Sequence, residues 1–99
     1  MIRQIFITPI KDGVTDDALQ ERIAAQRGLK EHVAGIEAIT VDRALGLYGL
    51  DNAVVMTIDL KDMDAWNALL ASDYHTELGN TLSQYFDADG AIAVQVEVQ

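Results

Sequence analysis

The sequence predicts an α+β fold in which four strands form one antiparallel sheet and two helical segments cover one of its faces. Apolar segments with strand character cover residues 2–10, 36–44, 53–60 and 91–98, and helical patterns separate the first two and the last two of them. The order is therefore βαββαβ, with the second helix split in two. A chain of 99 residues is long enough for one hydrophobic core and too short for two, so we expect a single domain over residues 1–99.

The composition narrows the classes of function. Seven basic and sixteen acidic residues give a net charge of −9, which repels nucleic acid and anionic membrane surfaces. The absence of cysteine excludes disulfides and thiolate chemistry. No apolar run approaches the length of a membrane span, and the first residues lack the pattern of a signal peptide. We expect a cytoplasmic protein without metal or cofactor, and with neither nucleic acid nor membrane as a partner.

The first strand is apolar on both of its faces. Gln4 and Phe6 lie on one face, and Ile5 and Ile7 lie on the other. Helices on one side of the sheet can bury only one of these faces, so the other needs an apolar partner, most simply the sheet of a second copy. This pattern predicts a homodimer through the sheet faces, which together form a barrel. The strand over residues 53–60 is also apolar on both faces and is predicted to be central.

The first helical segment begins at Thr15 or Asp16, either of which can cap it, and runs to about residue 31. Its apolar side gathers Ala18, Leu19, Ile23, Ala25 and Leu29. Arg22 and Gln26 fall inside this apolar arc. Either Arg22 extends its charged end to the helix edge, as long cationic side chains often do, or both side chains point into a pocket.

The second helical segment covers residues 62–86 and carries a histidine on an apolar stripe. Its first part, which Asp62 can cap, has Met63, Trp66, Leu69 and Leu70 on one side. Ser72-Asp73 interrupts the helix and restarts it. In the second part, His75 shares a face with Leu78, Leu82 and Phe86. A histidine in this position either contacts a ligand, and titrates near neutral pH, or is packed as a core residue.

The other connections are a loop and a turn. Residues 45–52 contain two glycines and end in Asp51-Asn52, which is typical of a loop. Residues 87–90 are interpreted as a turn rather than a calcium loop, because the later ligand positions of such a loop are missing. The last strand then places Ile92, Val94 and Val96 on one face.

Three segments resemble the stress-responsive dimeric α+β barrel (Dabb) family, a branch of the ferredoxin-like dimeric barrels. They are Met1-Ile2-Arg3-Gln4-Ile5, then Lys11-Asp12-Gly13-Val14-Thr15, and Leu60-Lys61-Asp62-Met63-Asp64-Ala65 with its continuation Leu70-Ala71-Ser72-Asp73-Tyr74-His75. The resemblance extends over essentially the whole chain. It implies a homodimeric barrel with a pocket between sheet and helices.

In the plant polyketide cyclase of this family, a first-strand histidine and the histidine that matches His75 form an acid–base pair, helped by a tyrosine on the preceding helix. This sequence has Gln4 at the first-strand position and Leu69 at the tyrosine position. Since glutamine cannot exchange a proton near pH 7, the cyclase pair is incomplete here. The family's pocket positions on the first helix correspond to Arg22, Ile23 and Gln26.

Together these features predict a pocket for a small apolar, aromatic or polyketide-like molecule. Gln4 and His75 would meet its carbonyl or phenolic oxygen, with His75 acting as an acid or base in cyclase- or isomerase-like chemistry. Arg22 would offer its charge to an anionic group. The other ligand-binding residues are expected to be Phe6, Ile23, Gln26, Trp66 and Leu69.

Two alternative functions stay open. Antibiotic-biosynthesis monooxygenases, including haem-degrading members, are similar dimeric barrels whose site combines an amide, a tryptophan and a histidine; Gln4, Trp66 and His75 would take these parts. The second alternative is a non-enzymatic, stress-related structural dimer. A sealed core without a pocket would favour the structural dimer.

Overall fold

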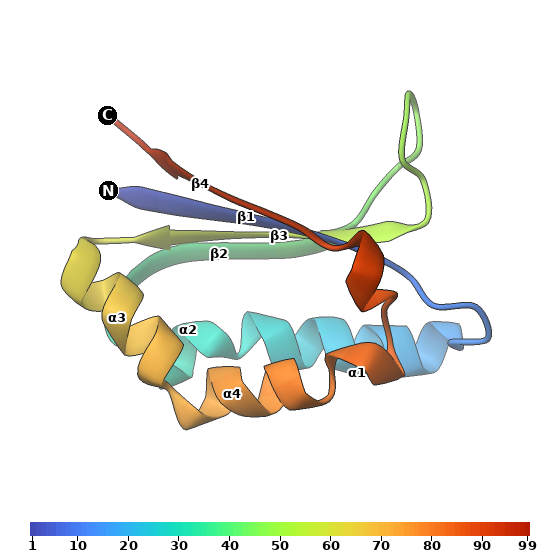
Figure 1. The fold of residues 1–99 in the computed structure, drawn as a ribbon, viewed down its shortest axis with the longest axis horizontal. Coiled ribbons are helices and arrows are strands. Elements are labelled where there is room, and N and C mark those ends of the chain that lie inside the picture. Colours follow the sequence, from blue (N-terminus) through green and yellow to red (C-terminus); the bar gives the residue numbers. More distant parts are fainter.

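The computed structural model describes residues 1–99. Its elements are β1 (Ile2–Pro9), α1 (Asp16–Arg27), α2 (Leu29–His32), β2 (Ile36–Arg43), β3 (Ala53–Leu60), α3 (Met63–Ala71), α4 (Asp73–Asn80), the 3₁₀ turns η1 (Leu82–Gln84) and η2 (Ala88–Gly90), and β4 (Ile92–Glu97). The strands form one sheet in the order β2-β3-β1-β4, and every neighbouring pair is antiparallel. Helices α1 to α4 all lie on the same side of this sheet (Figure 1). The predicted α+β, ferredoxin-like fold is confirmed, and β3 lies inside the sheet as predicted.

The core lies between the sheet and the helices. Its fully buried side chains come from β2 and β3, from α1 and α2, and from α3; they include Val41, Val54, Ile58, Leu60, Leu19, Ile23, Leu29 and Leu69. Thr15 caps α1 by accepting a hydrogen bond from the amide of Ala18 at 3.1 Å. These contacts follow the helical and strand periodicities of the sequence, which predicted which residues share a side of each helix and strand.

The first helical segment is divided at Gly28 rather than continuous to residue 31. A Cβ atom on Gly28 would lie 2.5 Å from the hydroxyl oxygen of Tyr74, so a glycine is needed where the tyrosine crosses the helix. The Tyr74 hydroxyl donates a hydrogen bond to the carbonyl of Ala25 at 2.6 Å, and its ring stacks on His32 at 3.9 Å. Tyr74 thereby fixes α4 against α1 and α2.

Two predictions for the second helical segment are wrong. Met63 and Leu70 are 58% and 52% exposed, because α3 turns Ala65 and Leu69 toward the sheet, and at 100° per residue the other two point away. The helix that carries His75 ends at Asn80, so Phe86 is not on its stripe. Phe86 instead forms an isolated β-bridge with Ile10 and is buried in the core.

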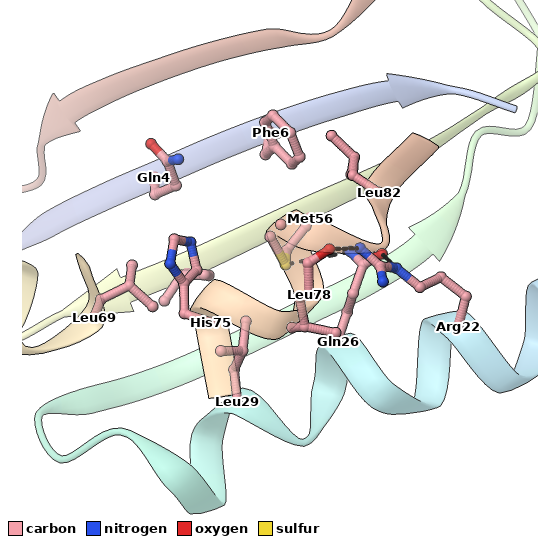
Figure 2. A pocket seen from close by; sticks show the side chains of 12 residues that line it. Gln4, Phe6, Arg22, Gln26, Leu29, Met56, Leu69, His75, Leu78 and Leu82 are labelled. Carbon is pink, nitrogen blue, oxygen red and sulfur yellow. Dashed lines mark hydrogen bonds between the residues drawn. The ribbon is translucent and has the colours of Figure 1, made fainter. Parts of the chain in front are cut away.

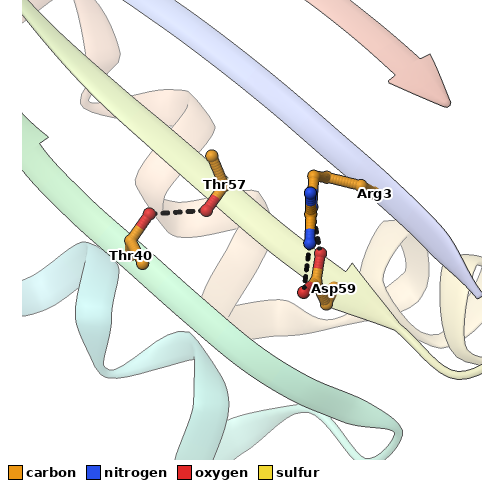
Figure 3. Close-up of polar contacts among 4 residues, drawn as sticks. All are labelled: Arg3, Thr40, Thr57 and Asp59. Atoms are coloured by element: carbon orange, nitrogen blue, oxygen red, sulfur yellow. Dashed lines mark hydrogen bonds and ion pairs between the residues drawn. The ribbon is translucent and has the colours of Figure 1, made fainter. Parts of the chain in front are cut away.

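The second face of the sheet is open. The strand register places Arg3, Ile5 and Ile7 opposite Val96, Val94 and Ile92 of β4. These residues alternate with Gln4 and Phe6, which face the helices, so they lie on the other side of the sheet. A two-bond pair joins Arg3 to Asp59 on this face, with N–O distances of 2.7 and 3.0 Å, and Thr40 is hydrogen-bonded to Thr57 (Figure 3). Ile92, Val94 and Val96 share this face, as the alternation of the last strand predicted, and all three are exposed. None of the helices has the length and apolar character that crossing a membrane requires.

Candidate functional site

A cavity of about 130 Å³ lies between the sheet and the helices (Figure 2). Its walls come from β1, β3, α1, α2, α3, α4 and η1. The lining residues are Gln4, Phe6, Arg22, Gln26, Leu29, Met56, Ile58, Leu69, His75, Leu78, Gly79 and Leu82. Most of this surface is apolar, and the polar groups that reach it are few. This is the usual composition of a small-molecule site.

Six of the predicted site residues line this cavity: Gln4, Phe6, Arg22, Gln26, Leu69 and His75. Two others do not. Ile23 is 2% exposed and packs in the core. Trp66 is partly buried and lines a separate surface recess with Ile2 and Met63, at the start of β1. The structure therefore brings Gln4 and His75 together without the tryptophan.

Arg22 is buried, with 4% of its surface exposed, so the interpretation that its charged end reaches the helix edge is wrong. Its Nε donates to the Oε1 of Gln26 at 3.0 Å, its Nη1 to the Oγ1 of Thr81 at 2.9 Å, and its Nη2 to the carbonyl of Leu78 at 2.7 Å. Gln26 is itself held by a contact of its Nε2 with the sulfur of Met56 at 3.5 Å. The guanidinium thus ties α1 to the last turn of α4.

No carboxylate compensates the charge of Arg22. The ion pairs of the protein lie elsewhere, between the N-terminus and Glu97, Arg3 and Asp59, Arg27 and Asp42, and Arg43 and Asp16. The guanidinium carbon lies 5.2 Å from the ring centre of Tyr85 and 5.7 Å from that of Phe86. Burial lowers the pKa of Arg22, which still stays protonated at neutral pH. The cavity therefore borders a buried positive charge that is balanced only by dipoles and aromatic rings.

His75 reaches the cavity from the first turn of α4. The helix restarts at Ser72-Asp73, as the sequence predicted, and Ser72 caps it by accepting a hydrogen bond from the His75 amide at 3.3 Å. The imidazole is half-buried, points toward Gln4 across the cavity (Figure 2), and makes no hydrogen bond with the rest of the protein. Burial lowers the pKa of His75 below its usual value, so the ring is neutral at pH 7 and one of its nitrogens can accept a proton.

Gln95 is a polar residue of this region that the predicted site did not include. It lies opposite Gln4 in the β1–β4 register, and its Nε2 donates to the Oε1 of Gln4 at 2.6 Å. This bond occupies the Gln4 carbonyl and leaves the two amide hydrogens of Gln4 for another acceptor. The signal in the sequence was the alternation of the last strand, which places Gln95 opposite to the face of Val94 and Val96.

The cavity thus combines an amide donor, a neutral imidazole and a buried guanidinium within apolar walls. Such a set can hold a small molecule that carries oxygen atoms at two ends, and the imidazole can take up or release a proton there. No group of three or more His, Cys, Asp or Glu side chains lies together in a way that could hold a metal ion.

No family model and no curated protein matches the chain. Solved structures match it over nearly its whole length. The protein At3g17210 from Arabidopsis thaliana has 14% sequence identity and a TM-score of 0.86, covering 100% of this chain and 96% of that one. A dimeric ferredoxin-like protein of unknown function from Thermobifida fusca has 22% identity and a TM-score of 0.83, covering 98% and 90%.

A protein from Deinococcus radiodurans, suggested to be an antibiotic biosynthesis monooxygenase, has 13% identity and a TM-score of 0.79, with 100% of this chain and 93% of that one covered. At identities this low, structural likeness is evidence of the fold alone. The chain accordingly has the ferredoxin-like α+β fold that is also found in dimeric proteins.

Proposed function

We propose that the protein binds a small anionic molecule in the cavity, and that His75 moves a proton on it. The observation that carries this proposal is the buried guanidinium of Arg22, which has no carboxylate partner and borders the same cavity as an imidazole with no hydrogen bond. A buried charge without a counter-charge is costly to maintain, so an anionic ligand would supply the counter-charge that Arg22 lacks.

The size of the cavity limits the ligand. An apolar protein cavity of roughly 150 Å³ holds a benzene molecule. A cavity of about 130 Å³ therefore suits a single ring or a chain of similar volume, including a fragment of a polyketide. Phe6 and Leu69 supply apolar contacts for such a molecule, and the anionic group would lie at Arg22.

The second oxygen of the ligand would lie at the other end of the cavity, between Gln4 and His75. There the free amide hydrogens of Gln4 would polarise a carbonyl group, while neutral His75 takes a proton from the adjacent carbon. The electron pair of the broken C–H bond forms the enolate, whose oxygen stays bonded to Gln4. Return of the proton to carbon or oxygen completes an isomerase-like or cyclase-like step, in which Gln4 polarises but exchanges no proton.

Binding is tested by calorimetry with benzoate and its neutral analogue benzamide. The wild-type protein should prefer benzoate by at least about tenfold, because a charge-assisted bond to Arg22 is stronger than a neutral one. Arg22→Gln should lose this preference, whereas Arg27→Gln, which removes an exposed arginine from the same helix, should keep it. Equal binding of both compounds would disprove the anion preference, and binding of neither would count against the pocket.

Proton transfer is tested with 4-oxopentanoate, which carries a carboxylate and a ketone on a chain short enough for the cavity. In D₂O, the wild-type protein should accelerate exchange of the hydrogens next to the ketone, and His75→Gln should abolish this acceleration while still binding the ligand. Exchange that continues in His75→Gln would remove the histidine from the mechanism.

The shared location of Gln4 and His75 has a separate test. Gln4→His places a second imidazole in the cavity, and two imidazoles there should titrate as a coupled pair, with at least one pKa lowered by the like charge. NMR titration that gives two independent histidines with solution-like pKa values would show that positions 4 and 75 do not share a site.

A homodimer through the open sheet faces is part of the proposal, as is membership of the stress-responsive barrel family. The apolar side chains of Ile5, Ile7 and Val94 support dimerisation, since they share one face, on which Val94 is exposed and the two isoleucines are partly exposed. The related fold from Thermobifida fusca is dimeric. Of the alternatives, a monooxygenase site that uses Trp66 has less support, because this side chain lies outside the cavity. A purely structural dimer has less support because the core is not sealed.

A further inference from the structure

The loop between β2 and β3 presents large apolar side chains to solvent. Leu45, Leu47 and Leu50 are 85%, 87% and 53% exposed, and Tyr48 is fully exposed. We call residues 45–50 the arm. Exposed apolar residues are common singly, but four large ones within six positions form a patch that a monomeric surface rarely keeps.

The backbone of the arm has a defined conformation. Gly46 and Gly49 have φ angles of +71° and +102°, which side-chain-bearing residues rarely adopt. A Cβ atom on Gly46 would lie 2.5 Å from that of Asp51, so the two sides of the loop touch at its neck. At the base, the amide of Ala44 donates to the carbonyl of Ala53 at 2.9 Å. The two glycines therefore turn Leu47 and Tyr48 outward at the tip of a closed loop.

The direction of the arm indicates its partner. Figure 1 shows the loop rising from the sheet on the side opposite to the helices, which is the side of the open face. Stacked sheets lie about 10 Å apart, so a loop that rises from this face extends into the space that a second sheet would occupy or border. The arm also carries no basic residue, and the chain has a net charge of −9, which disfavours an anionic membrane as the partner.

We propose that the arm packs against a second copy of this chain and clasps it at the edge of the dimer. The inference rests on the dimer proposed above and adds a second contact, outside the sheet faces. In a two-fold dimer each arm contacts the other chain, so every arm residue contributes twice. The contact would thus bury the apolar tip of the arm and extend the interface at its rim.

The proposal is tested by sedimentation equilibrium on a double variant, Leu47→Ser with Tyr48→Ser. The dimer dissociation constant should rise by at least about tenfold. Leu70→Ser removes another exposed leucine, from α3 on the helical side of the molecule, and should leave the constant unchanged. An unchanged constant in the double variant would overturn the proposed arm contact. A monomeric wild-type protein would overturn the proposed dimer as well.

A fluorescence measurement tests whether the tip of the arm leaves water when the dimer forms. Because the chain has no cysteine, Tyr48→Cys offers a single site for an environment-sensitive thiol dye. Its emission should shift to the blue as the protein concentration rises through the dimer range, and Ile5→Lys, which opposes dimerisation, should abolish the shift. A dye that stays in water in a proven dimer, or that shifts only with phosphatidylcholine vesicles, would overturn the proposal.

Discussion

The two sides of the sheet differ in whether their arginines have a carboxylate partner. On the helix-covered face, Arg22 is buried without any carboxylate partner and borders a cavity. On the open face, the guanidinium of Arg3 is bonded through two nitrogens to Asp59 within one chain. The pair raises the pKa of Arg3 and lowers that of Asp59. One face thus carries a buried charge without a counter-charge, and the other pairs its charge within the chain.

Because of this difference, the two faces suit different kinds of contact. An interface between identical chains buries a charge at lower cost when that charge is already paired, since an unpaired one must find a partner in the other chain or stay uncompensated. A ligand site has the opposite requirement, because an unpaired donor or charge is what selects a small molecule. Four measurements test whether the two faces differ in this way.

The largest effect is expected from Ile5→Lys on the open face. A lysine there would desolvate a charge in the proposed interface twice, once from each chain, so the dimer should weaken by at least about 100-fold. Sedimentation equilibrium measures this change. Gln20→Lys makes the same change of net charge at an exposed position of α1 and should leave the dimer intact. If both variants dimerise as the wild type does, the open face is not the interface.

The next effect concerns the pair on the open face. Asp59→Asn leaves the Arg3 guanidinium without its carboxylate and should weaken the dimer by at least about tenfold. The double variant Arg3→Gln with Asp59→Asn removes both charges and should recover most of the loss. A double-mutant cycle on the dimer dissociation constant checks this, and additive losses would mean that the pair remains solvated in the dimer.

A moderate effect is expected where α4 is fixed over the covered face. Gly28→Ala should cost about 1–2 kcal/mol of unfolding free energy, because its methyl group would displace the Tyr74 hydroxyl from the carbonyl of Ala25. In the Tyr74→Phe background, the same substitution should cost less. Denaturant unfolding of the four proteins measures the coupling, and equal costs in both backgrounds would contradict this role of Tyr74.

The smallest effect is the pH dependence that His75 contributes. Its folded-state pKa lies below 6.5, so the unfolded chain binds more protons between the two values. Stability should therefore decrease as the pH falls through 6.5 and level off below the folded-state pKa. His75→Gln should remove this contribution, and His75→Ala should cost less than about 1 kcal/mol at pH 7, since no hydrogen bond of the ring is lost. Identical pH profiles of the wild type and His75→Gln would mean that the ring is not desolvated.

Much of the fold was predictable because it depends on local chemistry. Thr15, Asp62 and Ser72 cap their helices as their residue types favour. Strand alternation grouped Ile5 with Ile7 and Val94 with Val96, and the register then places both groups on the same face. The helical period likewise placed Arg22 and Gln26 on the buried side of α1. The helical period does not determine whether the charged end of the Arg22 side chain is buried.

Residue types and periodicities predicted the order of the elements, the two faces of each strand, and the candidates His75 and Arg22; the family resemblance added Gln4. The packing of the whole chain set what they did not: Trp66 and Ile23 lie outside the cavity, Phe86 pairs with Ile10 instead of extending the helix, and Gln95 is hydrogen-bonded to Gln4. The reason is physical: caps and periodicities act within a few residues. Which side chains meet across a cavity depends on how α1, α4 and the sheet pack, which involves contacts between distant parts of the chain.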